Sequence, residues 1–471
     1  MQSPPPPPPA RSDRRLLAVL AAIALPYYLF LMAKGADSLF MPTRFGLTFN
    51  SMLAHLLRGA LDVDPAAIGA EGFLRDGRVY PYFGIVPALL RLPLLPFVDL
   101  ARTDVTGLMC ALAAWLAACC KFAAILRAGR ALPPSPLGRI ATLALIAATL
   151  FGGAQVPFLY PSLYQEAALF AGAFAALFVC LAIHGLLGAR GFTPALLAAM
   201  ALAAVLALLT RVSTGLGLCL ALVLLLAMLR PPRGLLVCLT FLALGIGAVL
   251  AINAARWGDP FVFVPHHLQA MTDLYAGRRE ILARYGDFHP IRLGYGLMYY
   301  FAPAWIIVGE DGRFLFEAFR SRTIISVELP PGSLLLSEPL LFLLTIFFLV
   351  ELRRSWPRDR LALPLIVGLA IPAALMLVAP SMTFRYRLEF YPALELAALL
   401  GLRTLGLRAA ATPAAASLRP VLLACCLLGI LVGQTTYLLH RASEIGDAAQ
   451  LLELGRLGAG PLAFYRPVLP F

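Results

Sequence analysis

Long apolar stretches, separated by shorter polar segments, dominate the pattern along this chain. A helix that crosses a bilayer needs about 20 predominantly apolar residues, and on that criterion we predict about eleven membrane-spanning helices. Their approximate limits are 16–33, 104–126, 139–155, 164–186, 194–209, 213–229, 234–254, 335–352, 361–380, 388–408 and 419–440. The pattern therefore predicts an all-α polytopic membrane protein.

Two of the segments between these helices, 34–103 and 255–338, are long and rich in polar residues. Short cytoplasmic connections retain Lys and Arg, whereas acids are largely indifferent to the side of the membrane. With a cytoplasmic amino terminus every inward connection is basic, and these connections contain Lys121, Arg127, Arg130, Arg139, Arg190, Arg230, Arg233, Arg353, Arg354, Arg358, Arg360, Arg403, Arg408 and Arg419. We therefore expect a multi-pass protein of the cytoplasmic (inner) membrane, with both long segments and a tail, 441–471, on the outer face.

The composition agrees with a chain surrounded by lipid, because 61% of its residues are hydrophobic, 13% are charged and the mean hydropathy is +0.84. The formal net charge of +13 comes mainly from Arg residues spread thinly between apolar stretches. A nucleic-acid-binding surface needs a basic stripe, so we expect no nucleic-acid partner. All eight Cys lie in apolar stretches, which argues against a disulfide framework or a zinc site, and we expect neither a metal nor a cofactor. The prolines Pro4–Pro9 predict that residues 1–15 form a disordered cytoplasmic tail.

The first long segment contains two stretches that favour the membrane surface. Between Phe45 and Gly59, apolar residues recur at helical spacing, which predicts an amphipathic helix lying along the bilayer. The apolar stretch Gly84–Leu100 contains Arg91 and the prolines Pro87, Pro93 and Pro96, which disturb a helix. We predict that this stretch lies in the interface or enters the membrane and returns, and does not cross it.

The acids of the first long segment are candidates for general-base chemistry. Asp37 follows the first predicted span, and Asp62 and Asp64 follow the amphipathic stretch. Partial desolvation at a lipid surface raises the proton affinity of a carboxylate toward neutrality, which suits a general base. The alternative for each is that it only keeps an outer loop soluble.

Three short motifs come later in the chain: Thr210–Gly215 between two predicted spans, Ala251–Pro260 at the start of the second long segment, and Arg385–Pro392 before a late span. Their order, together with an acid after the first helix, a juxtamembrane helix and a Pro-rich interfacial stretch, resembles the GT-C superfamily of integral-membrane glycosyltransferases. Protein mannosyltransferases and the lipid A aminoarabinose transferase are examples of that superfamily. The family's acids stand immediately before the juxtamembrane helix, whereas here Met41–Arg44 occupies that place and Asp37 lies further back.

The resemblance implies a GT-C-like transmembrane domain over 16–440 and a sugar donor carried on a polyprenyl phosphate. Asp37 is then the first candidate for the base that deprotonates an acceptor hydroxyl, with Asp62 or Asp64 in reserve. A guanidinium binds phosphate in a forked geometry, so we expect Arg211, Arg385 and Arg387 to meet at the level of the lipid headgroups. The other predicted substrate-binding residues are Arg44, Asp76, Arg78, Tyr80, Tyr164, Glu166, Arg256 and Tyr386.

Each of these residues also has a structural interpretation, since Arg side chains reach lipid headgroups and an acid such as Glu166 is favoured at the start of a helix by its dipole. The preferred function is transfer of a sugar from a polyprenyl phosphate to a glycan, lipid or protein acceptor on the outer face. A transporter or lipid flippase is the first alternative, and Glu395 in a predicted span would then line its path. A non-catalytic scaffold for envelope assembly is the second.

Overall fold

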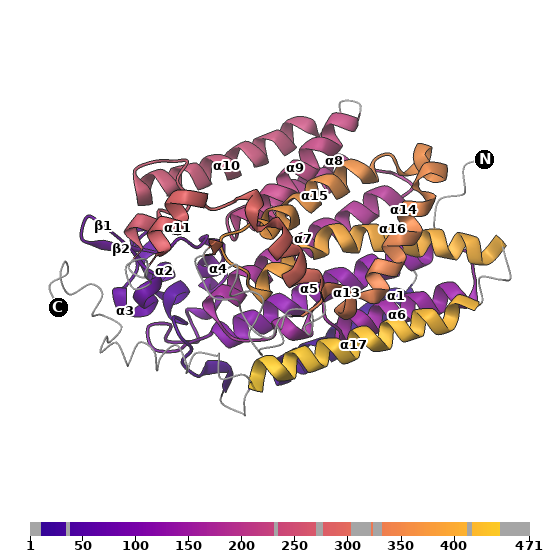
Figure 1. Ribbon diagram of the computed structural model, residues 1–471, viewed down its shortest axis with the longest axis horizontal. Coiled ribbons are helices and arrows are strands. Elements are labelled where there is room, and N and C mark those ends of the chain that lie inside the picture. The colour runs from indigo at the N-terminus through magenta and orange to yellow at the C-terminus, as the bar shows by residue number, and fades with distance from the viewer. Residues whose placement is uncertain are drawn as a thin grey trace.

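A computed structural model describes residues 11–33, 38–229, 234–269, 277–302, 322–323, 332–411 and 417–442. Within these residues the chain is almost entirely helical, and a helix coincides with each of the eleven predicted spans. These helices are α1 (Arg11–Met32), α5 (Thr106–Arg130), α6 (Pro136–Phe151), α7 (Leu163–Leu187), α8 (Pro194–Leu208), α9 (Val212–Met228), α10 (Leu235–Trp257), α14 (Pro339–Asp359), α15 (Ala362–Leu377), α16 (Tyr391–Ala411) and α17 (Arg419–Ala442). They run lengthwise side by side, which confirms the all-α polytopic fold (Figure 1).

Six of the described helices are long and apolar enough to cross a membrane, namely α1, α5, α6 with its short continuation, α7, α10 and α17. Helices α8, α9, α14 and α15 are apolar but shorter. Helix α16 is continuous, but its apolar sequence contains the charged residues Glu395, Arg403 and Arg408. The outward faces of α1, α10 and α17 expose large apolar side chains, as expected where helices contact lipid.

Side-chain caps and prolines fix several helix starts. Ser162 accepts a hydrogen bond from the backbone N–H of Gln165 at the start of α7, and Thr193 does the same for Leu196 in α8. Helix α10 ends at Gly258, whose φ of +79° is the left-handed conformation that glycine adopts without a steric penalty. The sequence therefore determines the bounds of these helices locally.

The first helix begins earlier than we predicted. Residues 11–15, assigned to a disordered tail, form the first turns of α1, whereas 1–10 lie outside the described residues. Asp13 stands in the first turn and pairs with Arg130 at the end of α5. The favourable position of an acid at a helix start, together with this ion pair, accounts for the extension.

The elements of the two long polar segments gather mainly at one end of the helices, where Figure 1 shows α2, α3, α4, the β-hairpin and α11 together. The α-helices are α2 (Thr48–Leu56), α3 (Pro65–Ile68), α4 (Val86–Leu89), α11 (Arg278–Tyr285), α12 (Leu293–Phe301) and α13 (Leu334–Ser337). The 3-10 helices described in these segments are η1 (Ser38–Phe40), η2 (Gly69–Glu71), η3 (Leu92–Leu94), η5 (His266–Leu268) and η7 (Pro290–Arg292). Two others, η4 (Val156–Phe158) and η10 (Phe384–Glu389), precede α7 and α16.

Strands β1 (Phe73–Arg75) and β2 (Arg78–Tyr80) pair antiparallel, with Phe73 opposite Tyr80. The two turn residues, Asp76 and Gly77, both have positive φ, as a two-residue hairpin turn of this kind requires. Phe73 also forms a β-bridge with Gln269. The two long polar segments are therefore joined by backbone pairing.

The stretch 84–100 does not form a long helix. It forms α4 and η3, because its prolines break helical hydrogen bonding, and it exposes Leu92, Leu95 and Phe97. The predicted amphipathic helix is α2, which packs against α4. Its polar residue Asn50 is buried and ties the loop together, a role that helical spacing alone did not indicate.

Candidate functional site

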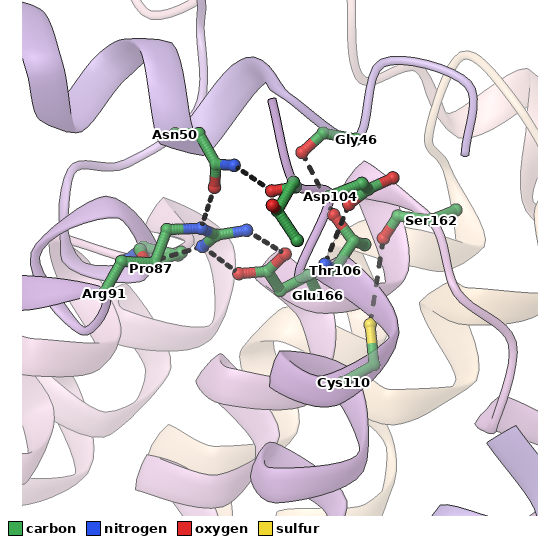
Figure 2. A network of polar contacts seen from close by, with 10 residues as sticks. Gly46, Asn50, Pro87, Arg91, Asp104, Thr106, Cys110, Ser162 and Glu166 are labelled. Atoms are coloured by element: carbon green, nitrogen blue, oxygen red, sulfur yellow. Dashed lines mark hydrogen bonds and ion pairs between the residues drawn. The ribbon is translucent and has the colours of Figure 1, made fainter. Parts of the chain in front are cut away.

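Arg91 connects the first long polar segment, 34–103, to α7. We call the segments 34–103 and 255–338 the first and second outer segments, after the face of the membrane on which we expect them. Its guanidinium contacts both carboxylate oxygens of Glu166, with Nη1–Oε1 at 2.5 Å and Nη2–Oε2 at 2.9 Å, and neither side chain is exposed (Figure 2). Arg91 also donates from Nε to Asn50 Oδ1 at 2.7 Å and from Nη1 to the Pro87 carbonyl at 2.9 Å. The carboxylate of Glu166, a predicted substrate ligand, is therefore occupied by Arg91, and these contacts support a structural role.

Asp104 holds the other end of the same segment. Its Oδ2 accepts from the backbone N–H and the hydroxyl of Thr43, at 2.7 and 2.8 Å, and its Oδ1 accepts from the N–H of Thr106 at 2.8 Å. The Thr106 hydroxyl in turn donates to the Gly46 carbonyl at 3.1 Å (Figure 2). The residues before α2 are thereby fixed against the start of α5.

Arg211 precedes α9 and is held in place by Glu389. Its Nε donates to Glu389 Oε1 at 2.6 Å, and the hydroxyls of Ser213 and Thr214 donate to the same oxygen at 2.7 and 2.9 Å. Glu389 is buried, whereas the Arg211 side chain is 18% exposed. The motif Thr210–Gly215 therefore supplies both a guanidinium and the hydroxyl groups that fix its partner.

Arg385 and Arg211 both lie over the ring of Tyr386. Its guanidinium carbon is 4.5 Å from the ring centre of Tyr164 and 5.4 Å from that of Tyr386. The guanidinium carbon of Arg211 is 5.0 Å from the ring centre of Tyr386. Two partly exposed cations from distant parts of the sequence thus share one tyrosine, as cation–π attraction favours.

Tyr82 faces the same group of residues from the first outer segment. Burial raises the pKa of its hydroxyl above the ordinary value, Glu71 and Tyr386 raise it further, and the cations Arg385 and Arg211 lower it. The Tyr82 hydroxyl therefore lies within electrostatic reach of all four groups. It remains protonated, and able to donate a hydrogen bond, throughout the neutral pH range.

Glu71, at the end of η2, was not among our predicted site residues. Its side chain is buried, the amide of Gln269 donates to its Oε2 at 3.2 Å, and the hydroxyls of Tyr82 and Tyr164 lie beside it. No ion pair of Glu71 occurs within the described part of the chain. The sequence does contain a feature that could have identified Glu71, because it is the one acid in the apolar stretch from Ala66 to Leu74.

We call the residues Glu71, Tyr82, Tyr164, Arg211, Arg385 and Tyr386 the outer cluster. The expectation that Arg387 joins the other two arginines is wrong. Arg387 is buried against Phe384 and donates to the Ser337 hydroxyl and, at 3.4 Å, to the Gly332 carbonyl. Successive residues of a 3-10 helix are about 120° apart, so Arg385 and Arg387 in η10 project from different faces.

Arg256 supports the outer cluster from α10. It is buried, its Nη1 donates to the Phe83 carbonyl at 2.9 Å, and its own carbonyl accepts from Arg75. Tyr80 packs edge-on to Trp257 in the same region. These contacts fix the chain on both sides of Tyr82.

The other predicted residues lie apart from these contacts. Asp62 and Asp64 bind the two ring nitrogens of His55, at 3.1 and 3.3 Å. Arg78 is exposed near the hairpin tip, and so is Asp76, which pairs with Arg75. Arg44 lies over the ring of Phe45. Asp37, the first candidate for the base, lies outside the described residues.

A second polar group lies within the helix bundle. Lys121 of α5 pairs with Glu395 of α16 at 2.7 Å. Two small cavities meet this pair; the first is also lined by Glu338, and the second by Gln155 and Tyr391. Most of the remaining lining is apolar, so these cavities are better explained as packing gaps around a buried ion pair than as a substrate site. No cluster of His, Cys, Asp or Glu able to hold a metal ion occurs among the described residues.

The sequence matches no protein-family model and no curated protein. The structure is similar to the archaeal oligosaccharyltransferase AglB from Archaeoglobus fulgidus in complex with an inhibitory peptide and a dolichol-phosphate. The TM-score is 0.52 at 12% sequence identity, over 98% of this chain and 60% of that chain. An apo form of the Archaeoglobus fulgidus oligosaccharyltransferase gives a TM-score of 0.47 at 13% identity, over 90% of this chain and 55% of that chain.

This chain therefore spans about 60% of the length of the first of these structures. At this identity the likeness concerns the fold, and it agrees with the order of motifs along the sequence. The chain therefore shares its fold with the archaeal oligosaccharyltransferase AglB.

Proposed function

We propose that this protein transfers a sugar from a polyprenyl-phosphate donor to an acceptor at the outer face of the cytoplasmic membrane. The observation that carries the proposal is the shared position of Arg211 and Arg385 on Tyr386. Both guanidinium groups are partly exposed, and they come from two motifs far apart in the sequence. A fold that assembles two cations beside tyrosine hydroxyls suits an anionic ligand.

The chemistry of the donor explains why two guanidinium groups are useful. Negative charge develops on the phosphate as the glycosidic bond breaks, and positioned donors that face this charge stabilise the transition state. Arg remains charged next to lipid and presents several N–H groups to phosphate oxygens. Arg211 is already oriented by Glu389, so little rearrangement is needed on binding. The dolichol-phosphate bound in the AglB structure supports a lipid phosphate as the ligand of this fold.

Transport is supported less well by the same structure. A transporter path needs ionisable groups that can meet a substrate inside the membrane. Glu395 is instead paired with Lys121 and surrounded largely by apolar side chains. A scaffold that binds only a partner protein would have no use for two partly exposed cations beside tyrosines.

The test uses the full-length protein in lipid nanodiscs, incubated with labelled polyprenyl-phosphate sugars, and measures both lipid-phosphate binding and sugar release or transfer. Arg385→Gln should lower the affinity for polyprenyl phosphate by about 10-fold to 100-fold, which corresponds to the loss of one charge-assisted contact of about 1.5–3 kcal/mol. Arg102→Gln is the matched control, because Arg102 is an exposed arginine of the same outer segment.

Wild-type protein that neither binds polyprenyl phosphate nor releases sugar from any donor tested would refute the proposed function. Equal lipid-phosphate binding by wild type and Arg385→Gln would remove the outer cluster as its site. The two results are separable because the first concerns the activity and the second concerns its location.

A further inference from the structure

The outer cluster contains one carboxylate that is not paired with a cation. Glu389 faces Arg211 and two hydroxyls, and Glu166 faces Arg91, so both serve as partners within the fold. Glu71 has a different environment, in which its hydrogen-bond donor is the neutral amide of Gln269. In the described residues no Lys or Arg forms an ion pair with it. A buried carboxylate whose hydrogen-bond partner is a neutral amide is not used as a counter-ion within the described part of the fold, so it is available for another role.

The neighbours of Glu71 place it next to the cations without direct contact. Tyr82 and Tyr164 both interact electrostatically with Glu71, and Arg385 lies over the ring of Tyr164, with its guanidinium carbon 4.5 Å from the ring centre. Gln269 belongs to the second outer segment, and its backbone bridge to Phe73 holds it beside Glu71. The Glu71 carboxylate and the Arg385 guanidinium therefore interact with the same two tyrosines.

We propose that Glu71 is the base that takes the proton from the acceptor, and that the acceptor presents a neutral hydroxyl group. This inference rests on the proposed function. A carboxylate acceptor would be repelled by Glu71, and an ammonium group would be repelled by Arg211 and Arg385. A hydroxyl can donate to Glu71 and accept from the tyrosine hydroxyls, so it matches the hydrogen-bonding groups that are present.

The reaction then proceeds with a balanced exchange of bonds. The acceptor oxygen forms a bond to the anomeric carbon of the sugar while its proton passes to the Glu71 carboxylate. The bond from that carbon to the phosphate oxygen breaks, and its electron pair remains on the phosphate beside the arginines. The products are a glycosylated acceptor and a polyprenyl phosphate, and Glu71 returns its proton to water.

The test compares Glu71→Gln, Glu71→Asp and wild type in nanodiscs, with labelled polyprenyl-phosphate sugars as donors and simple alcohols or water as acceptors. General-base catalysis contributes about 100-fold to 10,000-fold, so Glu71→Gln should lose at least about 100-fold in kcat. Its affinity for polyprenyl phosphate should stay unchanged, and Glu71→Asp should recover part of the rate. Glu280→Gln is the control, because Glu280 is an exposed acid on α11 of the second outer segment.

Two outcomes would overturn this assignment while leaving the proposed function intact. Glu71→Gln with the wild-type rate would show that another group removes the proton. Loss of lipid-phosphate binding together with the rate would show that Glu71 supports the fold of the site. Failure of the wild type to turn over any donor would instead count against the proposed function.

Discussion

Arg91 and Glu166 form a two-point ion pair in which neither side chain is exposed. The pair links the segment between α4 and η3 to the first turn of α7. Because Asn50 binds the same guanidinium and the carbonyls of Leu100 and Thr103, this pair lies at the centre of a network that fixes most of the first outer segment. The outer cluster depends on that segment, since Tyr82 belongs to it.

Removing one partner of this pair should destabilise the fold. Glu166→Leu leaves the Arg91 charge buried without its counter-ion, and breaking a buried pair in this way costs about 3–5 kcal/mol. The double variant Arg91→Met with Glu166→Leu removes both charges and should recover much of the loss. Thermal unfolding of the detergent-solubilised protein measures both effects. A single variant as stable as wild type would contradict the structural role of Glu166.

Glu389 should affect lipid-phosphate binding through Arg211. Glu389→Gln keeps the shape of the side chain but removes the charge that orients Arg211, Ser213 and Thr214. Arg211 should then sample more orientations, and affinity for polyprenyl phosphate should fall by about 10-fold, equivalent to about 1.4 kcal/mol. The fold should survive, as a melting curve would show. Binding measured by titration at low and high salt separates loss of orientation from simple screening, because salt should weaken binding by both proteins whereas the difference between them should persist at high salt.

The eleven helices were predictable from the sequence because each is a long apolar stretch, and several have a local start or end signal. Ser162, Pro194 and Gly258 illustrate how strongly single residues determined those bounds. Arg211 and Arg385 were also found from motifs. Their common contact with Tyr386 required the folded chain, because 174 residues (385 − 211) separate them in the sequence.

The remaining site residues could not be found from sequence in the same way. Arg387 was grouped with Arg385 because the two are close in the sequence, but the 3-10 geometry of η10 directs them apart. Glu71 resembles any loop acid until Gln269 and the two tyrosines come together around it. Long-range contacts thus decided which charged residues share a site, whereas local patterns decided the helices.

Tyr82 should make the folded protein sensitive to alkaline pH. Its folded-state pKa is raised, first by burial and then by Glu71, so the protonated form is favoured in the folded state. The contribution of protonated Tyr82 to the free energy of unfolding is fully present below the unfolded pKa of about 10. It is lost as the pH rises through the folded-state pKa. Tyr82→Phe lacks this ionisation and should lose less stability between pH of about 9 and 11 than the wild type. Unfolding temperatures recorded over that range, with Tyr285→Phe as a control, test the expectation; identical slopes for wild type and Tyr82→Phe would contradict it.

The ion pair between Lys121 and Glu395 distinguishes the proposed enzyme from a transporter. If the pair serves only to pack α5 against α16, the double variant Lys121→Met with Glu395→Leu should retain sugar transfer, because both charges disappear together and the surrounding cavities are largely apolar. Lys121→Met alone should be less stable, since it leaves Glu395 without its partner inside the bundle. Transfer assays and melting curves on the same nanodisc preparations provide the comparison. Loss of activity in a fully folded double variant would show that charge within the bundle takes part in function. That result would favour the transporter alternative.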